Sequence, residues 1–293
     1  MTPSIHPETT VGPVHLVVAD LERSLRFYGD VLGLRAAVRY NGTVTLAATS
    51  VADPESAVVV LSERPGAGPQ PPRTTGLYHF AVLMPGRAAL ARSLRRLIEK
   101  RYRLQGASDH LVSEALYLAD PEGNGIELYA DRPREQWPRR GDRIAMATDP
   151  LDLDDLLGEL SRGAGDQHEF ALDPATRIGH IHLRVSDLAT AEAFYAGLLG
   201  FDVMVRDYPG ALFVSAGGYH HHIGLNTWGS AGAPPPPPDS AGLRDFTIRL
   251  PDEDALQPVL QRLRAGGVKA AQTPDGWRVV DPAGNGVLLT AVR

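Results

Sequence analysis

Three side chains in the first half of the sequence have the types and spacing of a metal site. His15 lies in VHLVVA, His79 in YHFAVLM and Glu127 in GIELYA, and each segment has the composition of a β-strand. Two imidazoles and one carboxylate form a set that leaves positions open on Fe(II) for oxygen chemistry. The chain has no cysteine, which excludes disulfides and thiolate ligands. Any bound metal is therefore expected to be held by nitrogen and oxygen.

An internal repeat singles out the carboxylate of this set. The stretch SEALYLADPEGNGIELY, from Ser113, is echoed by WRVVDPAGNGVLLT, from Trp277, and the alignment places Leu288 opposite Glu127. A carboxylate buried in a sheet is costly unless a positive charge meets it. Since the other copy does without this carboxylate, the fold does not require it. We therefore expect a chemical role for Glu127, with a metal ion as its partner.

The chain is a duplication built from shorter units. GPVHLVVADLERSLRFYGDVLGL, from Gly12, matches GHIHLRVSDLATAEAFYAGLLGF, from Gly179, and a weaker pair begins at Gly76 and Gly242. These matches define four modules in two halves. In the second half His182 corresponds to His15, whereas the other three site positions are changed. The replacements are Asp245 for His79, Leu288 for Glu127 and Arg278 for Tyr117.

Each module has the pattern of a strand, a helix and several short strands. In the first, VHLVVA is followed by Asp20 as helix cap and by apolar residues at helical spacing up to Gly33. The predicted class is α+β, with four βαβββ modules whose helices cover one sheet face and leave the other to curl round a hollow. If both modules of the first half share one sheet, His15, His79 and Glu127 converge there. The predicted domains are 11–133, a linker with a short helix at 134–177, and 178–293.

These features resemble a known superfamily. The modules, the D-L-x(n)-F-Y-x(3)-L-G helix and the D-P-x-G-N-G-x-E strand are similar to the vicinal oxygen chelate proteins, the fold of glyoxalases and type I extradiol dioxygenases. The resemblance covers nearly the whole chain and is greatest to the bacterial two-half catechol 2,3-dioxygenase type. It implies two duplicated half-barrel domains, a metal site in the first and a degenerate site in the second.

The resemblance also implies an activity. It predicts Fe(II), or alternatively Mn(II), held by His15, His79 and Glu127, and a ring-cleaving reaction between dioxygen and a catechol-like diol. His110, in the loop SDHLVSEALY, would move a proton, and Tyr117 would hydrogen-bond the substrate oxygens. No residue is assigned to an organic cofactor.

Two other functions stay open at this point. A glyoxalase-like isomerase or lyase would use Zn or Ni with Glu63 as fourth ligand, and the equal 48-residue separations of His15 from Glu63 and His79 from Glu127 favour it. Aligning the strand ends instead places Val59 opposite Glu127, and we prefer that alignment. A metal-free module that binds small molecules is the third reading, and the intact set of potential ligands argues against it.

The run YHHHIGLNTW carries three further histidines. In a strand, successive residues face opposite sides, so at most His220 and His222 could converge, with His180 or His182, in a second metal site. Without a carboxylate there, we expect these residues and His221 to form a polar strand edge or a domain contact.

Charge and composition indicate which kind of molecule the protein is expected to bind. The net charge is −6 with acids and bases interleaved, which favours a small-molecule ligand over nucleic acid or an anionic membrane. The hydrophobic content of 43% is normal for a packed core. No signal pattern begins the sequence, and no apolar run approaches the roughly 18 residues of a membrane span. We expect a cytoplasmic protein and allow a homo-oligomer, since the sequence does not fix the oligomeric state.

Overall fold

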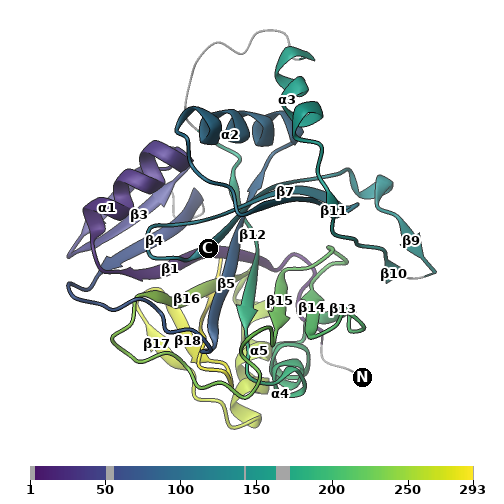
Figure 1. Cartoon of the computed structure of the whole chain (residues 1–293). Helices are drawn as coiled ribbons and strands as arrows, with labels where there is room; N and C mark the ends of the chain where they lie inside the picture. The colour runs from purple at the N-terminus through teal and green to yellow at the C-terminus, as the bar shows by residue number, and fades with distance from the viewer. Residues whose placement is uncertain (1–3, 51–55, 142, 163–171, 293) are drawn as a thin grey trace. The chain divides into compact units, whose positions relative to one another are not determined.

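The computed structural model describes residues 4–50, 56–141, 143–162 and 172–292, and its strands form two large sheets (Figure 1). The chain repeats one order of elements four times: a strand, a helix and three strands. The predicted α+β class with four βαβββ modules is therefore confirmed. Of the helices in the described residues, none is both long and apolar enough to cross a lipid bilayer.

The first two modules contain the following elements. Module one consists of β1 (Thr10–Val18), α1 (Leu21–Arg26), η1 (Phe27–Leu32), β2 (Arg35–Tyr40), β3 (Thr43–Ala47) and β4 (Ala57–Glu63). Module two consists of β5 (Gly76–Met84), α2 (Arg87–Glu99), β6 (Gly106–Asp109), β7 (Ser113–Ala119) and β8 (Gly125–Asp131). The segment that follows contains η3 (Arg134–Gln136), β9 (Arg139–Arg140), β10 (Arg143–Ile144), β11 (Asp149–Pro150) and α3 (Leu153–Arg162).

The last two modules repeat this order. Module three consists of β12 (Arg177–Arg184), α4 (Leu188–Glu192), η4 (Ala193–Leu198), β13 (Asp202–Val205), β14 (Ala211–Ser215) and β15 (Ile223–Asn226). Module four consists of β16 (Gly242–Leu250), α5 (Glu253–Ala265), β17 (Ala271–Thr273), β18 (Gly276–Val280) and β19 (Gly286–Ala291).

The sheets combine the modules in an order that differs from the one predicted. The eight-stranded sheet has the order β17-β18-β19-β16-β1-β4-β3-β2, so module one shares a sheet with module four. The nine-stranded sheet, β11-β6-β7-β8-β5-β12-β15-β14-β13, joins module two to module three. The predicted pairing of modules one and two in a single sheet is therefore wrong. The repeat reveals the modules because their patterns are local, whereas the partner of each first strand is a long-range choice.

The packing of the chain divides it into two compact units. The predicted boundaries at 11–133, 134–177 and 178–293 stay a prediction, and residues 142 and 163–171 of the predicted linker lie outside the described residues. The described residues of the first unit are 4–17, 66–79 and 179–292, and those of the second are 18–50, 56–65, 80–141, 143–162 and 172–178.

A buried tyrosine ties a helix to a hairpin in the second unit. Asp20 caps α1 by accepting a hydrogen bond of 2.8 Å from the amide of Arg23, as predicted. Two turns later, the hydroxyl of Tyr28 donates to Oδ2 of Asp120 at 2.9 Å. Asp120 also accepts from the amide and the side chain of Asn124, at 2.8 and 2.9 Å. Asp120 of the first D-P-x-G-N-G sequence thus stabilises its turn through Asn124 and also binds the tyrosine of the F-Y pair.

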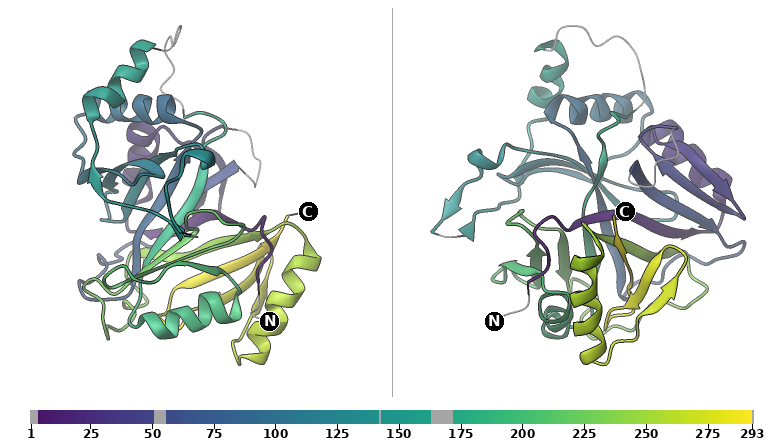
Figure 2. Two further views of the ribbon diagram at one scale, coloured as in Figure 1. Left: turned by 90° about the vertical axis from the view of Figure 1, so that its right-hand side faces the viewer. Right: turned by 180° about the vertical axis from the view of Figure 1, so that it is seen from behind.

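The first unit contains the same connection. The hydroxyl of Tyr195 donates to Asp281 at 3.0 Å, and Asp281 closes the second D-P-x-G-N-G turn with Asn285. Figure 2 shows α5 beside the helix of residues 188–198, and there Arg262 donates to the carbonyl of Leu198 at 2.9 Å. Both repeated motifs therefore have structural roles, and only the residues that differ between the copies remain to be explained by function.

Candidate metal site

One face of β5, β7 and β8 carries both His79 and Glu127. A packed cluster on this face consists of Ala81, Leu83, Ala115, Tyr117 and Tyr129. His79 stands two residues before Ala81, and Glu127 two residues before Tyr129, so strand alternation gives both side chains this same face.

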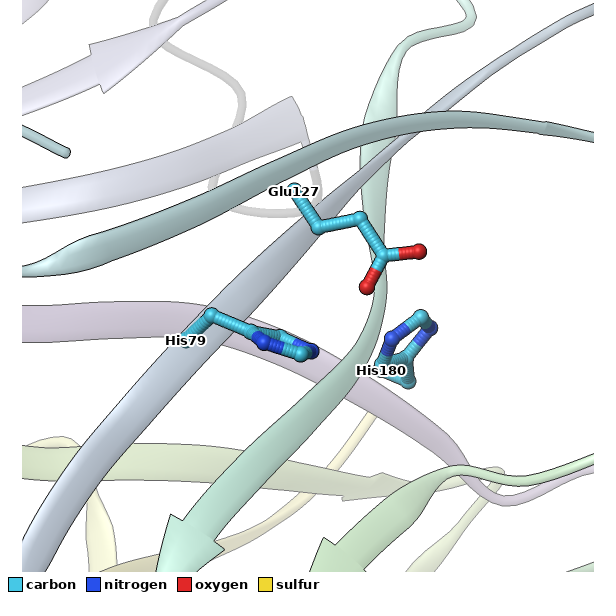
Figure 3. Close-up of side chains that lie close together, drawn as sticks. All are labelled: His79, Glu127 and His180. Carbon is cyan, nitrogen blue, oxygen red and sulfur yellow. The ribbon is translucent and has the colours of Figure 1, made fainter. Parts of the chain in front are cut away.

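The structure brings a third ligand to these two. One ligand atom each from His79, Glu127 and His180 lies within 4.8 Å of the others (Figure 3). The three residues come from β5, β8 and β12, which are consecutive in the nine-stranded sheet. Their exposed fractions are 8%, 3% and 2%, respectively. Two imidazoles and a buried carboxylate fit a divalent metal, because the ion supplies the positive charge that offsets burial of the acid.

His15 is not in this group of described residues. It lies in register with Asp245 on β16, and its Nδ1 is 3.7 Å from Oδ1 of that residue. Nε of Arg278 is 3.3 Å from Oδ2 of the same carboxylate. Burial lowers the pKa of His15, and the charge of Asp245 partly opposes this effect. In this structure the set expected from the sequence keeps His79 and Glu127, and His180 takes the place of His15.

The repeat alignment contained a signal for His180. GPVHL matches GHIHL, so Pro13 stands opposite His180, just as Leu288 stands opposite Glu127. A ligand lost from the other copy is the signature that singled out Glu127. His15 and His182, by contrast, are kept in both copies and are therefore explained by the fold at least as well as by chemistry.

His182 lies beside the candidate ligands, and its ring occupies space that a side chain at Gly224 would fill. Its ring centroid is 5.0 Å from that of His79. It stands in register with Gly224 on the parallel strand β15, where an added Cβ would come within 2.9 Å of its ring. The absence of a side chain at Gly224 gives the His182 ring its place on the inner face.

The two residues expected to be catalytic are hydrogen-bonded to each other. Nε2 of His110 is 2.6 Å from the hydroxyl of Tyr117, and its Nδ1 is 2.7 Å from the carbonyl of Ala147. A carbonyl only accepts, so Nδ1 carries a proton, and in the neutral ring Nε2 accepts from the tyrosine. Tyr117 stands in register with Glu127 on β8. The hydrogen bond therefore connects Tyr117, which stands opposite Glu127, to His110.

The turn that carries His110 is tightly held. The neighbouring Leu111 has φ of 68°, a conformation that is uncommon for a residue other than glycine. Its amide donates to Oδ1 of Asp109 at 2.8 Å, while Arg132 donates to Oδ2 of Asp109 at 2.8 Å. These contacts fix the imidazole where Tyr117 can reach it.

Glu63, the expected fourth ligand of the isomerase, contacts the backbone at the start of α1. Its side chain is exposed, and its Oε1 accepts a hydrogen bond of 3.0 Å from the amide of Leu21. It thus satisfies an amide in the first turn of α1. Among the described residues, the metal-binding group does not include Glu63.

The three consecutive histidines occupy the turn between β14 and β15, so the alternation of a strand does not apply to them. The ring centroid of His221 is 4.2 Å from that of His180, and Nδ1 of His221 is 2.9 Å from Nδ1 of His220. His222 contacts the hydroxyl of Ser215 at 2.9 Å. The turn therefore lies beside His180. In the described residues, none of its three histidines belongs to the group of His79, Glu127 and His180.

Comparison with known proteins identifies the family. Residues 10–128 and 177–287 match the Glyoxalase/Bleomycin resistance protein/Dioxygenase superfamily. The chain belongs to this superfamily. A relative from Bacillus subtilis (strain 168), named catechol-2,3-dioxygenase, is 46% identical over 293 residues, covering 99% of both chains.

Solved structures support the superfamily fold. Glyoxalase I from Zea mays is similar with a TM-score of 0.56 and 18% identity, covering 96% of this chain and 92% of that one. The cppA protein from Streptococcus pneumoniae TIGR4 has a TM-score of 0.54 and 12% identity, covering 100% of both chains. At this identity the likeness shows the fold alone. Because one fold occurs in proteins with such different names, the function has to be argued from the site.

Proposed function

We propose that this chain is a metal-dependent extradiol dioxygenase that cleaves the ring of a catechol-like diol, with Fe(II) as the metal. The observation that carries the proposal is the buried set of His79, His180 and Glu127, together with the proton-carrying pair of Tyr117 and His110. The relative named catechol-2,3-dioxygenase, 46% identical over nearly its whole length, supports it.

The charge of the ligand set suits a diol. The two imidazoles are neutral as ligands and Glu127 contributes one negative charge, so a divalent ion would keep a net positive charge that a catecholate monoanion can neutralise. When bound, Fe(II) would supply open positions for both diol oxygens and for dioxygen. In the overall reaction both atoms of dioxygen enter the ring-opened product.

The residues of the chain account for the proton transfers. Tyr117 donates to Nε2 of His110, so its oxygen can accept a proton from the diol as its own proton moves to the imidazole. Nδ1 keeps its proton and donates it in a hydrogen bond to the carbonyl of Ala147, and this bond stabilises the imidazolium that forms. Reversal of these steps returns the proton to a developing oxyanion. His110 is thus the base and later the acid, and Tyr117 is the group that contacts the substrate.

The proposal is tested by anaerobic reconstitution with Fe(II), followed by catechol and air. We expect oxygen uptake and a yellow ring-opened product, and Glu127→Ala should bind no metal and take up no oxygen above background. Glu63→Gln is the matched control, because the amide oxygen can still accept from Leu21. This variant should keep both metal and activity.

Three results would contradict the proposal. Activity that survives in Glu127→Ala would refute the ligand set. Tight Zn or Ni binding that depends on Glu63, without oxygen uptake, would favour the isomerase. Ligand binding that is unchanged by chelators, in protein produced with ample iron, would favour a metal-free binding module.

A further inference from the structure

Within the residues that the structure describes, an arginine on the candidate ligand strand has no acidic partner. Arg184 ends β12 and is partly buried, and its guanidinium carbon lies 5.3 Å from the ring centroid of Tyr78. Among the described residues, this ring is its one charged or aromatic contact. Arg132, by contrast, is paired with both Asp109 and Glu114. Burial lowers the pKa of Arg184, yet a guanidinium remains protonated at neutral pH.

Next to this arginine lies a second donor, the side-chain amide of Asn226, for which the described residues offer no acceptor. Asn226 stands in register with Arg184 on the parallel strand β15, so both side chains project to the same face of the sheet. Asn226 is fully buried, and its Oδ1 accepts from the amide of Trp228 at 3.1 Å. Its Nδ2 makes no hydrogen bond within the described part of the chain. A buried amide donor and a partly buried cation are costly to leave without an acceptor.

Contacts between aromatic rings connect Arg184 and Asn226 to the candidate ligands. The centroid of His182 is 5.0 Å from His79 and 5.1 Å from Tyr78, the ring that lies beneath Arg184. Trp228 touches both rings, at 5.6 Å from Tyr78 and 5.5 Å from His182. A chain of ring contacts therefore connects the candidate ligands to the guanidinium, and such rings suit an aromatic substrate with an acidic group at its far end.

The alternation of side chains along β12 also places Arg184 on the side of the candidate ligand His180. His180, His182 and Arg184 alternate along β12 and face one side. Four strand residues span roughly 13 Å. A metal-bound aromatic ring with a short acidic arm and the long arginine side chain can bridge this distance together.

We propose that Arg184 and Asn226 form a subsite for a carboxylate on the substrate ring, so that the preferred substrates are catechols with an acidic side arm. The inference rests on the proposed function and specifies its substrate class. The guanidinium offers two parallel donors to the carboxylate, and the asparagine amide offers a third. Arg184 and Asn226 are specificity residues here, since they contact the substrate away from the reacting oxygens.

The test compares two diols that differ in the carboxylate alone. The Zn(II)-loaded protein, which has no redox chemistry, is titrated calorimetrically with 3,4-dihydroxyphenylacetate and with 4-ethylcatechol. In the unmodified protein we expect the acidic diol to bind about tenfold or more tightly than the neutral one. Arg184→Gln should bring the ratio close to one by weakening the acidic diol alone, and Arg184→Lys should give an intermediate ratio.

Two further variants sharpen the comparison. Asn226→Asp places a carboxylate in register with Arg184 and should abolish the preference by occupying the guanidinium. Arg177→Gln, at the exposed start of the same strand, is the matched control and should keep the ratio. Circular dichroism and metal content verify that each variant is folded and loaded.

The outcomes separate the inference from the function on which it depends. Equal binding of both diols by the unmodified protein, or a preference that persists in Arg184→Gln, overturns the carboxylate subsite and leaves the dioxygenase proposal standing. Failure of both diols to bind the metal-loaded protein overturns the dioxygenase proposal, and the inference with it.

Discussion

The hydroxyl of Tyr117 and Nε2 of His110 are 2.6 Å apart, and the other ring nitrogen of His110 is held by the carbonyl of Ala147. The carbonyl fixes the tautomer, so the nitrogen that can accept a proton in the neutral imidazole is the one that faces Tyr117. Tyr117 stands opposite Glu127 across β7 and β8, so the hydrogen-bonded pair begins at the strand position beside the buried carboxylate.

Replacing Tyr117 with Phe should therefore slow turnover without removing the metal. General acid and base groups typically contribute about 10²- to 10⁴-fold, and we expect a fall in kcat of at least about 10²-fold. Metal content should change little, because Tyr117 is not among the candidate ligands of the described residues. Tyr102→Phe is the control, because its hydroxyl donates to the carbonyl of Ala119 and has no part in the proposed proton route. Equal kcat in Tyr117→Phe and the parent protein would remove Tyr117 from the mechanism.

The choice between His180 and His15 as third ligand is decided by metal content. We expect His180→Ala to lose about one equivalent of Fe(II) or Zn(II) per chain, because two of three ligands do not hold the ion against a chelator. His15→Ala should keep the metal, since its imidazole faces Asp245. Elemental analysis after dialysis gives the stoichiometry of both variants. Loss of metal from His15→Ala with retention by His180→Ala would reinstate the ligand set expected from the sequence.

The sequence predicted those features of the fold that are local. The helix after Asp20, the strands around His79 and Glu127, and the hairpin that places Tyr117 beside Glu127 all follow from periodicity and spacing over short stretches. The modules were equally visible because the sequence repeats them. The three histidines, expected at a polar strand edge or a domain contact, lie in the turn between β14 and β15, which the strand-like residues on either side do not reveal.

The partner of each module was not predictable in the same way. All four first strands have similar apolar patterns, so nothing in β1 specifies that it pairs with β16 rather than with β5. The choice depends on long-range packing. The expected ligand set contains His15 for this reason, whereas the group that the described structure brings together contains His180. Pro13 opposite His180 marks this difference between the copies.

The two buried tyrosines offer a matched test of the repeated motifs. Burial raises the pKa of Asp120 and of Asp281, and the hydrogen bonds from Tyr28 and Tyr195 oppose that rise. Tyr28→Phe and Tyr195→Phe should each lower the free energy of unfolding by about 1–3 kcal/mol, because each removes a donor from a buried carboxyl group.

The measurement for these two variants is urea denaturation monitored by circular dichroism. Phe27→Leu, next to Tyr28, is a control that changes packing without removing a hydrogen bond. If neither tyrosine variant is less stable than the parent, the hydrogen bonds to Asp120 and Asp281 do not stabilise the fold.

The cluster around His15 should make the stability of the protein depend on pH. Burial lowers the pKa of His15 below its unfolded value of 6.5, since desolvation outweighs the favourable charge of Asp245. Arg244 and Arg278 also lower this pKa, while Asp275 raises it. Below about pH 6.5 the unfolded chain therefore binds more protons than the native one, so stability falls as the pH falls through this window.

His15→Gln removes this contribution, so its free energy of unfolding should fall less between pH 7 and pH 5 than that of the parent. Both proteins are measured metal-free in the presence of a chelator, because release of metal from other histidines would add its own pH dependence. His6→Gln, at an exposed position, controls for the loss of one imidazole. A steeper fall in His15→Gln than in the parent would mean that Asp245 dominates over burial and that the native state holds the imidazolium.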